Sequence, residues 1–206
     1  MITIPIIIVT ALISIAAFRS SKFQGKLLLS PYGIVHRKEW YRLVTHIFVH
    51  ADYLHLIVNM LVFFSFGIFA ENIFNQLKQE GYIASSTLHF CLLYFGGAVI
   101  SSLTTVNKHK DNIYYQGVGA SGGVSAVVFL SIFFEPLNKL LLMGIIPIPA
   151  ILFGVGYLVY SHYMSKKSAD NINHDAHFVG AVFGFIYPVL ISPSLFMVFL
   201  RELRIF

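Results

Sequence analysis

Residues 119–134 read GASGGVSAVVFLSIFF, in which a run of small residues leads into an uncharged apolar segment. Ser121 lies in the first turn of this segment, and a second apolar segment opens with His177. Polar and ionisable side chains are costly inside a membrane, so they are candidates for a functional site wherever they occur there. A serine and a histidine at matched depth suggest a nucleophile and its base.

The composition indicates that this apolar segment belongs to an integral membrane protein. Of 206 residues, 57% are hydrophobic and 11% are charged, and the mean hydropathy is +0.76. A soluble domain carries about 25% charged residues and could not bury this much apolar surface. We expect one membrane domain, residues 1–206, without an appended soluble module.

The basic charge of the chain bears on its partners. The net charge is +5, and the basic residues are scattered among short loops instead of forming one patch. Contact with anionic lipid headgroups explains this pattern better than contact with nucleic acid. We therefore expect membrane lipids, and no nucleic acid, among the partners.

Six apolar segments are each near the length of about 20 residues that a helix needs to cross a bilayer. They lie at 2–18, 53–73, 84–104, 119–134, 140–160 and 177–200. Backbone groups in lipid must be hydrogen-bonded internally, so these segments are predicted to be helices. The predicted fold class is all-α, a polytopic membrane protein with six transmembrane helices. The first segment could also be a signal peptide, but it carries no basic residue before Arg19, which favours a retained helix.

Three further features shape the expected bundle. Residues 19–52, the first loop, mix basic and aromatic side chains, which is typical of a segment lying in the headgroup region, although an ordinary surface loop also fits. Pro147 and Pro149 predict a bent fifth helix, because proline breaks the helical hydrogen-bond pattern. Gly180 and Gly184 predict a close approach of two helix backbones.

Counting segments brings the polar groups together. In a six-helix serpentine, helices two, four and six enter the membrane from the same side. His55 and Asn59 lie early in helix two, Ser121 begins helix four and His177 begins helix six. All four are therefore expected near one membrane face.

These groups can be assigned chemical roles. Histidine is the usual base for a serine nucleophile, and the free N–H groups at the start of a helix can hold an oxyanion. His55 and Asn59 are spaced i, i+4, so both can donate a hydrogen bond into one pocket. Gly119 and Gly122 would keep the backbone bare for a substrate carbonyl.

Other interpretations of the same residues remain open. The small residues around Ser121 could serve helix packing alone, His177 could bond a loop carbonyl, and His55 and Asn59 could link helices. A metal site is another interpretation, because histidine is a common zinc ligand and several histidines are clustered, namely His46, His50, His55, His174 and His177. The chain lacks a His-Glu-x-x-His motif, and no carboxylate or cysteine joins the cluster convincingly, so no metal is expected.

Taken together, the motifs resemble those of the rhomboid family of intramembrane serine proteases. The matching pieces are Gly-Ala-Ser-Gly at 119–122, Ala-His-Phe-Val-Gly at 176–180 with Gly184, the stretch 39–59 with its three histidines and Asn59, and Glu71. The similarity covers residues 36–188.

The resemblance implies a six-helix bundle with a Ser–His dyad and no cofactor. The implied site comprises Ser121 as nucleophile, His177 as general base, His55, Asn59 and the N–H of Ser121 as oxyanion hole, and Gly119, Ala120 and Gly122 as active-site backbone. Asp175 is not expected to complete a triad, Arg42 would have a structural role in the first loop, and the fifth segment with the 161–175 loop would form a movable gate and cap.

Two features depart from the family pattern. Some members carry a tyrosine four residues after the nucleophile, packed on the catalytic histidine, where this chain has Ser125. With a cytoplasmic N-terminus, which we keep by family analogy, the outer loops hold ten Lys and Arg and the inner segments four. That distribution opposes the positive-inside rule.

The resemblance implies a serine endopeptidase that cleaves single-pass transmembrane proteins in or next to their membrane helix. It also implies a plasma (inner) membrane location, with the active site facing the outer side. A catalytically inactive rhomboid-like protein that binds membrane clients, a lipid hydrolase and a small transporter are the alternatives. The transporter would need mid-membrane charges and an inverted repeat, and neither is visible.

Overall fold

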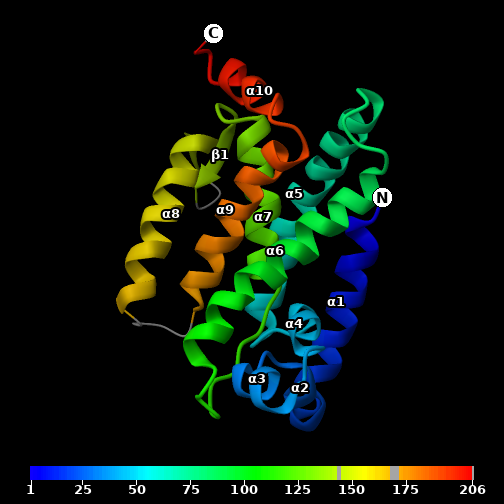
Figure 1. Ribbon diagram of the computed structural model, residues 1–206, viewed down its shortest axis with the longest axis vertical. Helices are drawn as coiled ribbons and strands as arrows, with labels where there is room; N and C mark the ends of the chain where they lie inside the picture. The colour runs from blue at the N-terminus through cyan, green and yellow to red at the C-terminus, as the bar shows by residue number, and fades with distance from the viewer. Residues whose placement is uncertain (143–144, 168–171, 206) are drawn as a thin grey trace.

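Helix α7 (Ser121–Phe134) lies at the centre of the molecule, with the other long helices around it (Figure 1). The computed structural model describes residues 1–142, 145–167 and 172–205. Thirteen of the fourteen residues of α7 are buried, as expected for a helix that is apolar on every side. Only its first residue, Ser121, is not fully covered.

Long helices and short surface elements alternate along the chain. The elements are α1 (Thr3–Phe18), α2 (Ser21–Leu27), α3 (Pro31–Arg37), α4 (Arg42–Thr45), η1 (His46–Phe48), α5 (Tyr53–Gln79), α6 (Ser86–His109), α7, β1 (Lys139–Leu142), β2 (Ile146–Pro149), α8 (Ala150–Lys167), α9 (His174–Ile191) and α10 (Leu195–Glu202). The first four predicted segments coincide with α1, α5, α6 and α7. The described part of the chain is thus helical apart from one small hairpin.

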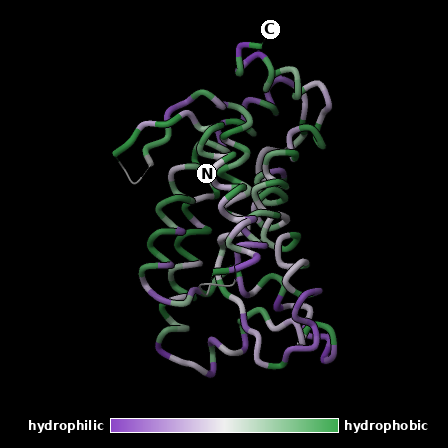
Figure 2. The backbone as a smooth tube through the Cα atoms, turned by 90° about the vertical axis from the view of Figure 1, so that its left-hand side faces the viewer, coloured by the Kyte–Doolittle hydropathy of each residue, from purple (hydrophilic) through white to green (hydrophobic). Residues whose placement is uncertain are grey.

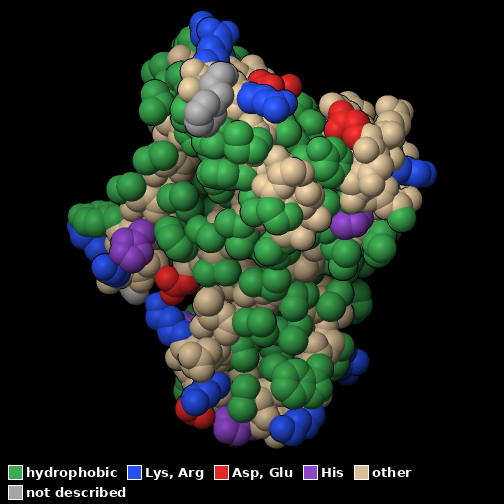
Figure 3. Space-filling view, turned by 45° about the horizontal axis from the view of Figure 1, so that its top comes forward, with side chains coloured by type: hydrophobic (Ala, Val, Ile, Leu, Met, Phe, Trp, Pro, Cys, Tyr) green, Lys and Arg blue, Asp and Glu red, His purple; other side chains and the backbone are tan. Residues whose placement is uncertain are grey.

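The outer surface has the character of a membrane protein. Among the described helices, α5, α6 and α9 are long and apolar enough to cross a membrane, and α1 and α7 are shorter apolar helices. Hydrophobic residues run through the length of the bundle in Figure 2. Figure 3 shows a largely hydrophobic face with charged side chains gathered toward its edges.

The prediction of one bent helix over 140–160 is wrong. β1 and β2 pair as antiparallel strands in which Leu141 lies opposite Pro147 and Lys139 opposite Pro149, and α8 begins only at Ala150. Proline lacks the N–H that a helix interior requires, whereas each strand of a two-stranded hairpin has a free edge that tolerates it. The helix therefore begins after the two prolines and is not bent by them.

The sixth predicted segment, 177–200, is also divided differently. α9 begins at His174, where the Asn173 side chain caps it by accepting a hydrogen bond from the N–H of Ala176 at 3.1 Å. It ends at Ile191, ahead of Pro193, and α10 follows. His177 is thus the fourth residue of α9 and does not open the helix.

The predicted close approach at Gly180 and Gly184 is confirmed. A Cβ atom added at Gly180 would overlap the carbonyl oxygen of Gly122, and one added at Gly184 would overlap that of Ala126. α7 and α9 therefore touch backbone to backbone, directly below the turn that carries Ser121.

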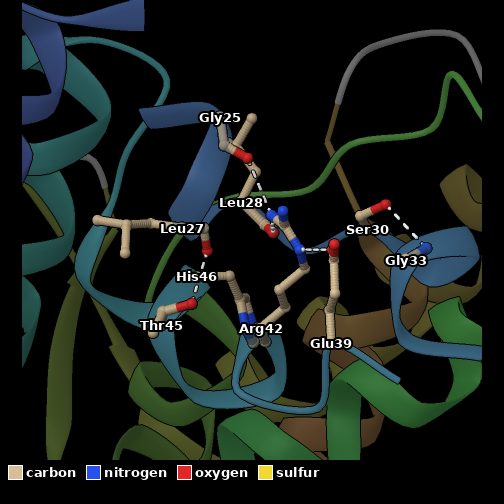
Figure 4. Close-up of polar contacts among 9 residues, drawn as sticks. All are labelled: Gly25, Leu27, Leu28, Ser30, Gly33, Glu39, Arg42, Thr45 and His46. Atoms are coloured by element: carbon tan, nitrogen blue, oxygen red, sulfur yellow. Dashed lines mark hydrogen bonds and ion pairs between the residues drawn. The ribbon is translucent and has the colours of Figure 1, made fainter. Parts of the chain in front are cut away.

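The first loop folds into α2, α3, α4 and η1. Arg42 lies at its centre (Figure 4) and donates to the carbonyl oxygens of Gly25 and Leu28 at 2.9 and 2.8 Å, while its Nε pairs with Glu39. Arg42 thus has a structural role in this loop.

Glu71 joins α5 to the start of α1. Its Oε1 accepts hydrogen bonds from the N–H groups of Ile2 and Thr3 at 2.9 and 2.7 Å. A carboxylate at a helix N-terminus satisfies N–H groups that have no partner within the helix. Glu71 therefore caps α1 from a neighbouring helix.

Candidate active site

The predicted polar residues meet in one cavity of about 650 Å³. Its walls come from α5, α6, α7, α8 and α9, together with parts of the first loop and the segment that precedes α7. Of the predicted site residues, those lining it are His55, Asn59, Gly119, Ser121, Gly122 and His177. Ala120 is fully buried and does not line the cavity; it is the N-cap residue of α7. The topology therefore gathers this set, and the role of each member stays a prediction.

The turn before Ser121 is tied to the first loop at two points. Gly117 and Leu29 exchange backbone hydrogen bonds of 3.0 and 2.9 Å, and the N–H of Gly119 donates to the carbonyl oxygen of His46 at 3.0 Å. Gly119 has a φ of +105°, which favours glycine. The first loop thereby fixes where α7 begins and where the Ser121 side chain projects.

His55 and Asn59 lie on the first turns of α5. Asp52 caps this helix by accepting from the N–H of His55 at 2.7 Å, and Asn59 Nδ2 donates to the His55 carbonyl oxygen at 3.0 Å. A Cβ added to Gly119 would lie 3.0 Å from His55 Cε1, so the imidazole packs against the turn that precedes Ser121. His55 thus lies against the turn at the start of α7, and both residues line the cavity.

The first-loop histidines are engaged in structural hydrogen bonds. Nδ1 of His46 donates to the Arg42 carbonyl oxygen at 2.8 Å. Ser14 donates its hydroxyl proton to the Phe48 carbonyl oxygen, so the 2.9 Å contact to Ser14 Oγ is donated by His50 Nδ1. Burial lowers the pKa of His46 to about 4 and that of His50 to about 3. Both imidazoles are therefore neutral at pH 7.

The histidine cluster does not assemble into a metal site in the described ranges. Among those residues, no three histidine, cysteine or carboxylate side chains are placed so that they could hold a metal ion. His46 and His50 use Nδ1 for the hydrogen bonds just described.

His177 packs between aromatic neighbours. The Tyr157 ring from α8 stacks on it with the centroids 6.4 Å apart and the planes 14° from parallel. His174 meets it edge-on at 6.0 Å. The Tyr157 hydroxyl lies 3.0 Å from Ser125 Oγ, on α7. Sequence reasoning singled out Ser125 and missed Tyr157, although Phe153 and Tyr157, one helical turn apart, marked an aromatic face on α8.

Asp175 pairs with a lysine of α6. Its Oδ2 accepts from Lys108 Nζ at 2.8 Å, which links the start of α9 to the end of α6. Asn173 strengthens that link by donating to Thr105 Oγ1 at 2.7 Å. The carboxylate therefore positions the first turn of α9.

The comparison with known protein families decides the identity of the fold. The Rhomboid domain family model matches residues 37–194. The chain belongs to the rhomboid family. Together with its apolar helices, this membership makes it a membrane protein.

Three curated relatives illustrate the breadth of this rhomboid group. The chain is 29% identical over 143 residues to "RHOMBOID-like protein 12, mitochondrial" of Arabidopsis thaliana, covering 68% of this chain and 43% of that one. It is 27% identical over 153 residues to "Putative rhomboid protease YdcA" of Bacillus subtilis (strain 168), covering 74% and 67%. It is 30% identical over 174 residues to "RHOMBOID-like protein 1" of Arabidopsis thaliana, covering 78% and 37%. The chain thus spans between 37% and 67% of the length of these relatives.

Proposed function

We propose that this rhomboid is an intramembrane serine endopeptidase that cleaves membrane-anchored proteins in or next to their transmembrane helix. One observation carries the proposal: Ser121 and His177, 56 positions apart, line the same cavity as His55 and Asn59. Family membership, and a relative whose printed name includes "rhomboid protease", support the same reaction class.

The proposed chemistry uses only side chains and N–H groups of this chain. His177 accepts the Ser121 hydroxyl proton as Oγ attacks the scissile carbonyl, and it then gives that proton to the leaving amine. The N–H of Ser121, at the free N-terminus of α7, and the side chains of His55 and Asn59 donate to the oxyanion. Water then hydrolyses the acyl-enzyme with His177 as base.

The proposed position in the membrane follows from helix lengths. α7 has 14 residues, and at a rise of about 1.5 Å per residue it is about 21 Å long. The hydrocarbon core of a bilayer is about 30 Å thick. If α1, α5, α6, α7, α8 and α9 are the six spans, Ser121 lies below the membrane surface, where the cavity admits water.

Substrate entry is proposed to occur beside α8. This helix leaves Leu152, Val155 and Val159 more than half exposed, so lipid or a substrate helix can contact them. The proposed substrates are single-pass transmembrane proteins, whose helix must unwind locally before a carbonyl can reach Ser121. A plasma membrane location with the cavity on the outer side completes the proposal.

The test is cleavage of a single-pass model substrate by protein purified in detergent. We compare the wild type with Ser121→Ala, His177→Ala and a control, Ser131→Ala, whose buried hydroxyl lies on the same helix and bonds the Val127 carbonyl. Loss of nucleophile or base should reduce the rate by about 10³-fold or more, and the control should retain it. Cleavage that persists in folded Ser121→Ala contradicts the dyad.

Covalent labelling separates an active enzyme from a client-binding rhomboid. A fluorophosphonate should attach to Ser121 in the wild type and in Ser131→Ala, and to neither dyad variant. A folded wild type that remains unlabelled and does not cut the substrate would favour the client-binding alternative. The double variant His55→Ala/Asn59→Ala should slow acylation by about 10²-fold, the usual effect of removing an oxyanion donor.

A further inference from the structure

We propose that Tyr157 is the positioning residue for the base His177, and that Ser125 fixes Tyr157 in turn. The proposal rests on the function proposed above and adds a residue to its machinery. The two aromatic planes lie 14° from parallel with centroids 6.4 Å apart, so the Tyr157 ring forms an offset stack with the imidazole.

The Tyr157 ring is itself held from two helices. Its hydroxyl bonds Ser125 Oγ at 3.0 Å, across from α8 to α7. Phe129, also on α7, packs against it with centroids 5.7 Å apart, and Phe153, one turn earlier on α8, stacks on it at 6.1 Å. Because both the ring and the hydroxyl of Tyr157 have packing or hydrogen-bond partners, its side chain has little freedom to rotate. It can therefore restrict the imidazole stacked beside it.

The size of Ser125 makes this arrangement possible. Ser125 lies one helical turn after Ser121 on α7, on the side that faces the cavity, and it is buried. A small hydroxyl there leaves room for a ring from α8 and supplies the hydrogen-bond partner that a buried phenol needs. His174, meeting His177 edge-on, limits the imidazole on another side.

Orientation of the base matters because proton transfer requires Nε2 or Nδ1 of His177 to face Ser121 Oγ. A misplacement of about 1 Å can lower a catalytic rate by about 10²-fold. Tyr157 exchanges no proton and contacts no substrate atom in this scheme; it acts by restricting the imidazole. Since it belongs to α8, the orientation of His177 depends on how α8 packs.

The experiment measures the rate of fluorophosphonate labelling at Ser121, which needs the base but no substrate helix. The variants are Tyr157→Leu, Tyr157→Phe, Ser125→Ala and the Tyr157→Phe/Ser125→Ala double. Tyr163→Leu is the matched control, because Tyr163 is an exposed tyrosine of the same helix. Thermal unfolding in detergent reports the fold of each variant.

Removing the ring in Tyr157→Leu should slow labelling by about tenfold and lower kcat for the model substrate while KM stays within about twofold. Tyr157→Phe and Ser125→Ala each lose the same hydrogen bond, so each should slow labelling by about threefold to fivefold. The double variant should be no slower than either single one. The control should label at the wild-type rate.

Three results overturn the inference. Labelling of folded Tyr157→Leu at the wild-type rate removes Tyr157 from the machinery. Additive losses in the double variant remove Ser125 as its anchor. If Tyr157→Leu does not fold, labelling of both Tyr157→Phe and Ser125→Ala at the wild-type rate also removes Tyr157 from the machinery. A wild type that is not labelled at all overturns the proposed function itself, so the two failures are distinguishable.

Discussion

Helix α9 contacts α7 and α8 in different ways. Toward α7 it presents Gly180 and Gly184, and the two backbones touch with no room for a methyl group. Toward α8 it presents His174 and His177, which meet rings of that helix at centroid distances of about 6 Å. Three of the eighteen residues of α8 are buried, against thirteen of fourteen in α7.

This contrast divides the site into two parts. The backbone of Ser121 and His177 belongs to the tightly packed α7–α9 pair, which the first loop supports through Leu29 and His46. The imidazole ring of His177, however, is covered from α8, the less buried helix. Close backbone packing can set where a residue lies, whereas the rotation of its side chain depends on separate contacts.

The largest expected effect comes from breaking the α7–α9 contact. In Gly184→Ala the new methyl group meets the backbone of Ala126, which cannot move aside without shifting a helix. We expect destabilisation of about 3 kcal/mol, at the upper end for overpacking. Unfolding temperature in detergent is the measurement.

Gly96→Ala is the matched control for Gly184→Ala. It lies in α6, where the nearest atom to an added Cβ is Phe183 Cζ at 3.7 Å, an ordinary contact. Alanine should raise helix stability there by up to about 1 kcal/mol. Equal unfolding temperatures for the two variants would show that the α7–α9 backbones are not in close contact.

The second effect tests how the first loop and Gly119 hold the serine turn. Gly119→Ala strains a φ of +105° and places a methyl group 3.0 Å from His55 Cε1. Moving that imidazole should lower cleavage by about 10²-fold. Gly81→Ala has a φ of +81° and no neighbour within 4 Å, so it carries similar strain without touching the site.

The comparison between these glycine variants separates strain from catalysis. Gly81→Ala should lose about 1–2 kcal/mol of stability and keep its activity. A Gly119→Ala protein that unfolds at the same temperature as Gly81→Ala and still cleaves at the wild-type rate would remove His55 from the oxyanion hole.

The third effect is a pH dependence of the first-loop support. Burial lowers the pKa of His46 from 6.5 to about 4, so the folded protein holds this side chain neutral. Below pH 6.5 the unfolded chain binds a proton at this side chain and the folded chain does not. The free energy of unfolding is therefore highest above pH 6.5 and falls toward pH 4. Between pH 7 and pH 5 the titration of His46 alone should lower the free energy of unfolding by about 2 kcal/mol.

Unfolding temperatures across that pH range check the prediction. His46→Gln should flatten the slope, because glutamine can still donate to the Arg42 carbonyl but does not titrate. Ser131→Ala, which removes a buried hydroxyl and no titratable group, is the control and should leave the slope unchanged. An identical slope in His46→Gln and the wild type would contradict the role of burial at His46.

Much of this architecture could be predicted from local sequence. Uncharged apolar length located α1, α5, α6 and α7, and segment parity gathered Ser121, His55 and His177 at one end of the bundle. Gly180 and Gly184 indicated the close helix contact, because their spacing alone selects one helix face. These inferences depend on composition or periodicity within single elements and on the order of the apolar segments along the chain.

The remaining features depend on which elements meet in space. Hydropathy could not separate the apolar strands β1 and β2 from the start of a helix, and only Pro147 and Pro149 marked the difference. The stacking of Tyr157 on His177 joins two helices whose relative rotation no local pattern encodes. The short distance between them in sequence did not reveal which faces are in contact.

The smallest expected effect tests the role of α8, by substitution of Gly154 and Gly156, which lie about half a helical turn apart. A Cβ at Gly154 would lie 3.1 Å from Ile132 Cδ1 and 3.4 Å from Phe129 Cε1, whereas one at Gly156 meets nothing within 4 Å. Gly156→Ala should therefore only raise helix stability, by up to about 1 kcal/mol, with activity unchanged.

Gly154→Ala should gain less stability and lower kcat by about twofold to threefold, because the displaced Phe129 also packs on Tyr157. Side-chain tips can give way by a few tenths of an ångström, which keeps this effect far below that of Gly184→Ala. Paired unfolding temperatures and turnover numbers are the measurement. If Gly154→Ala and Gly156→Ala show the same kcat, small displacements of α8 do not reach the base, and the division of the site into a tightly packed and a loosely packed part loses its functional meaning.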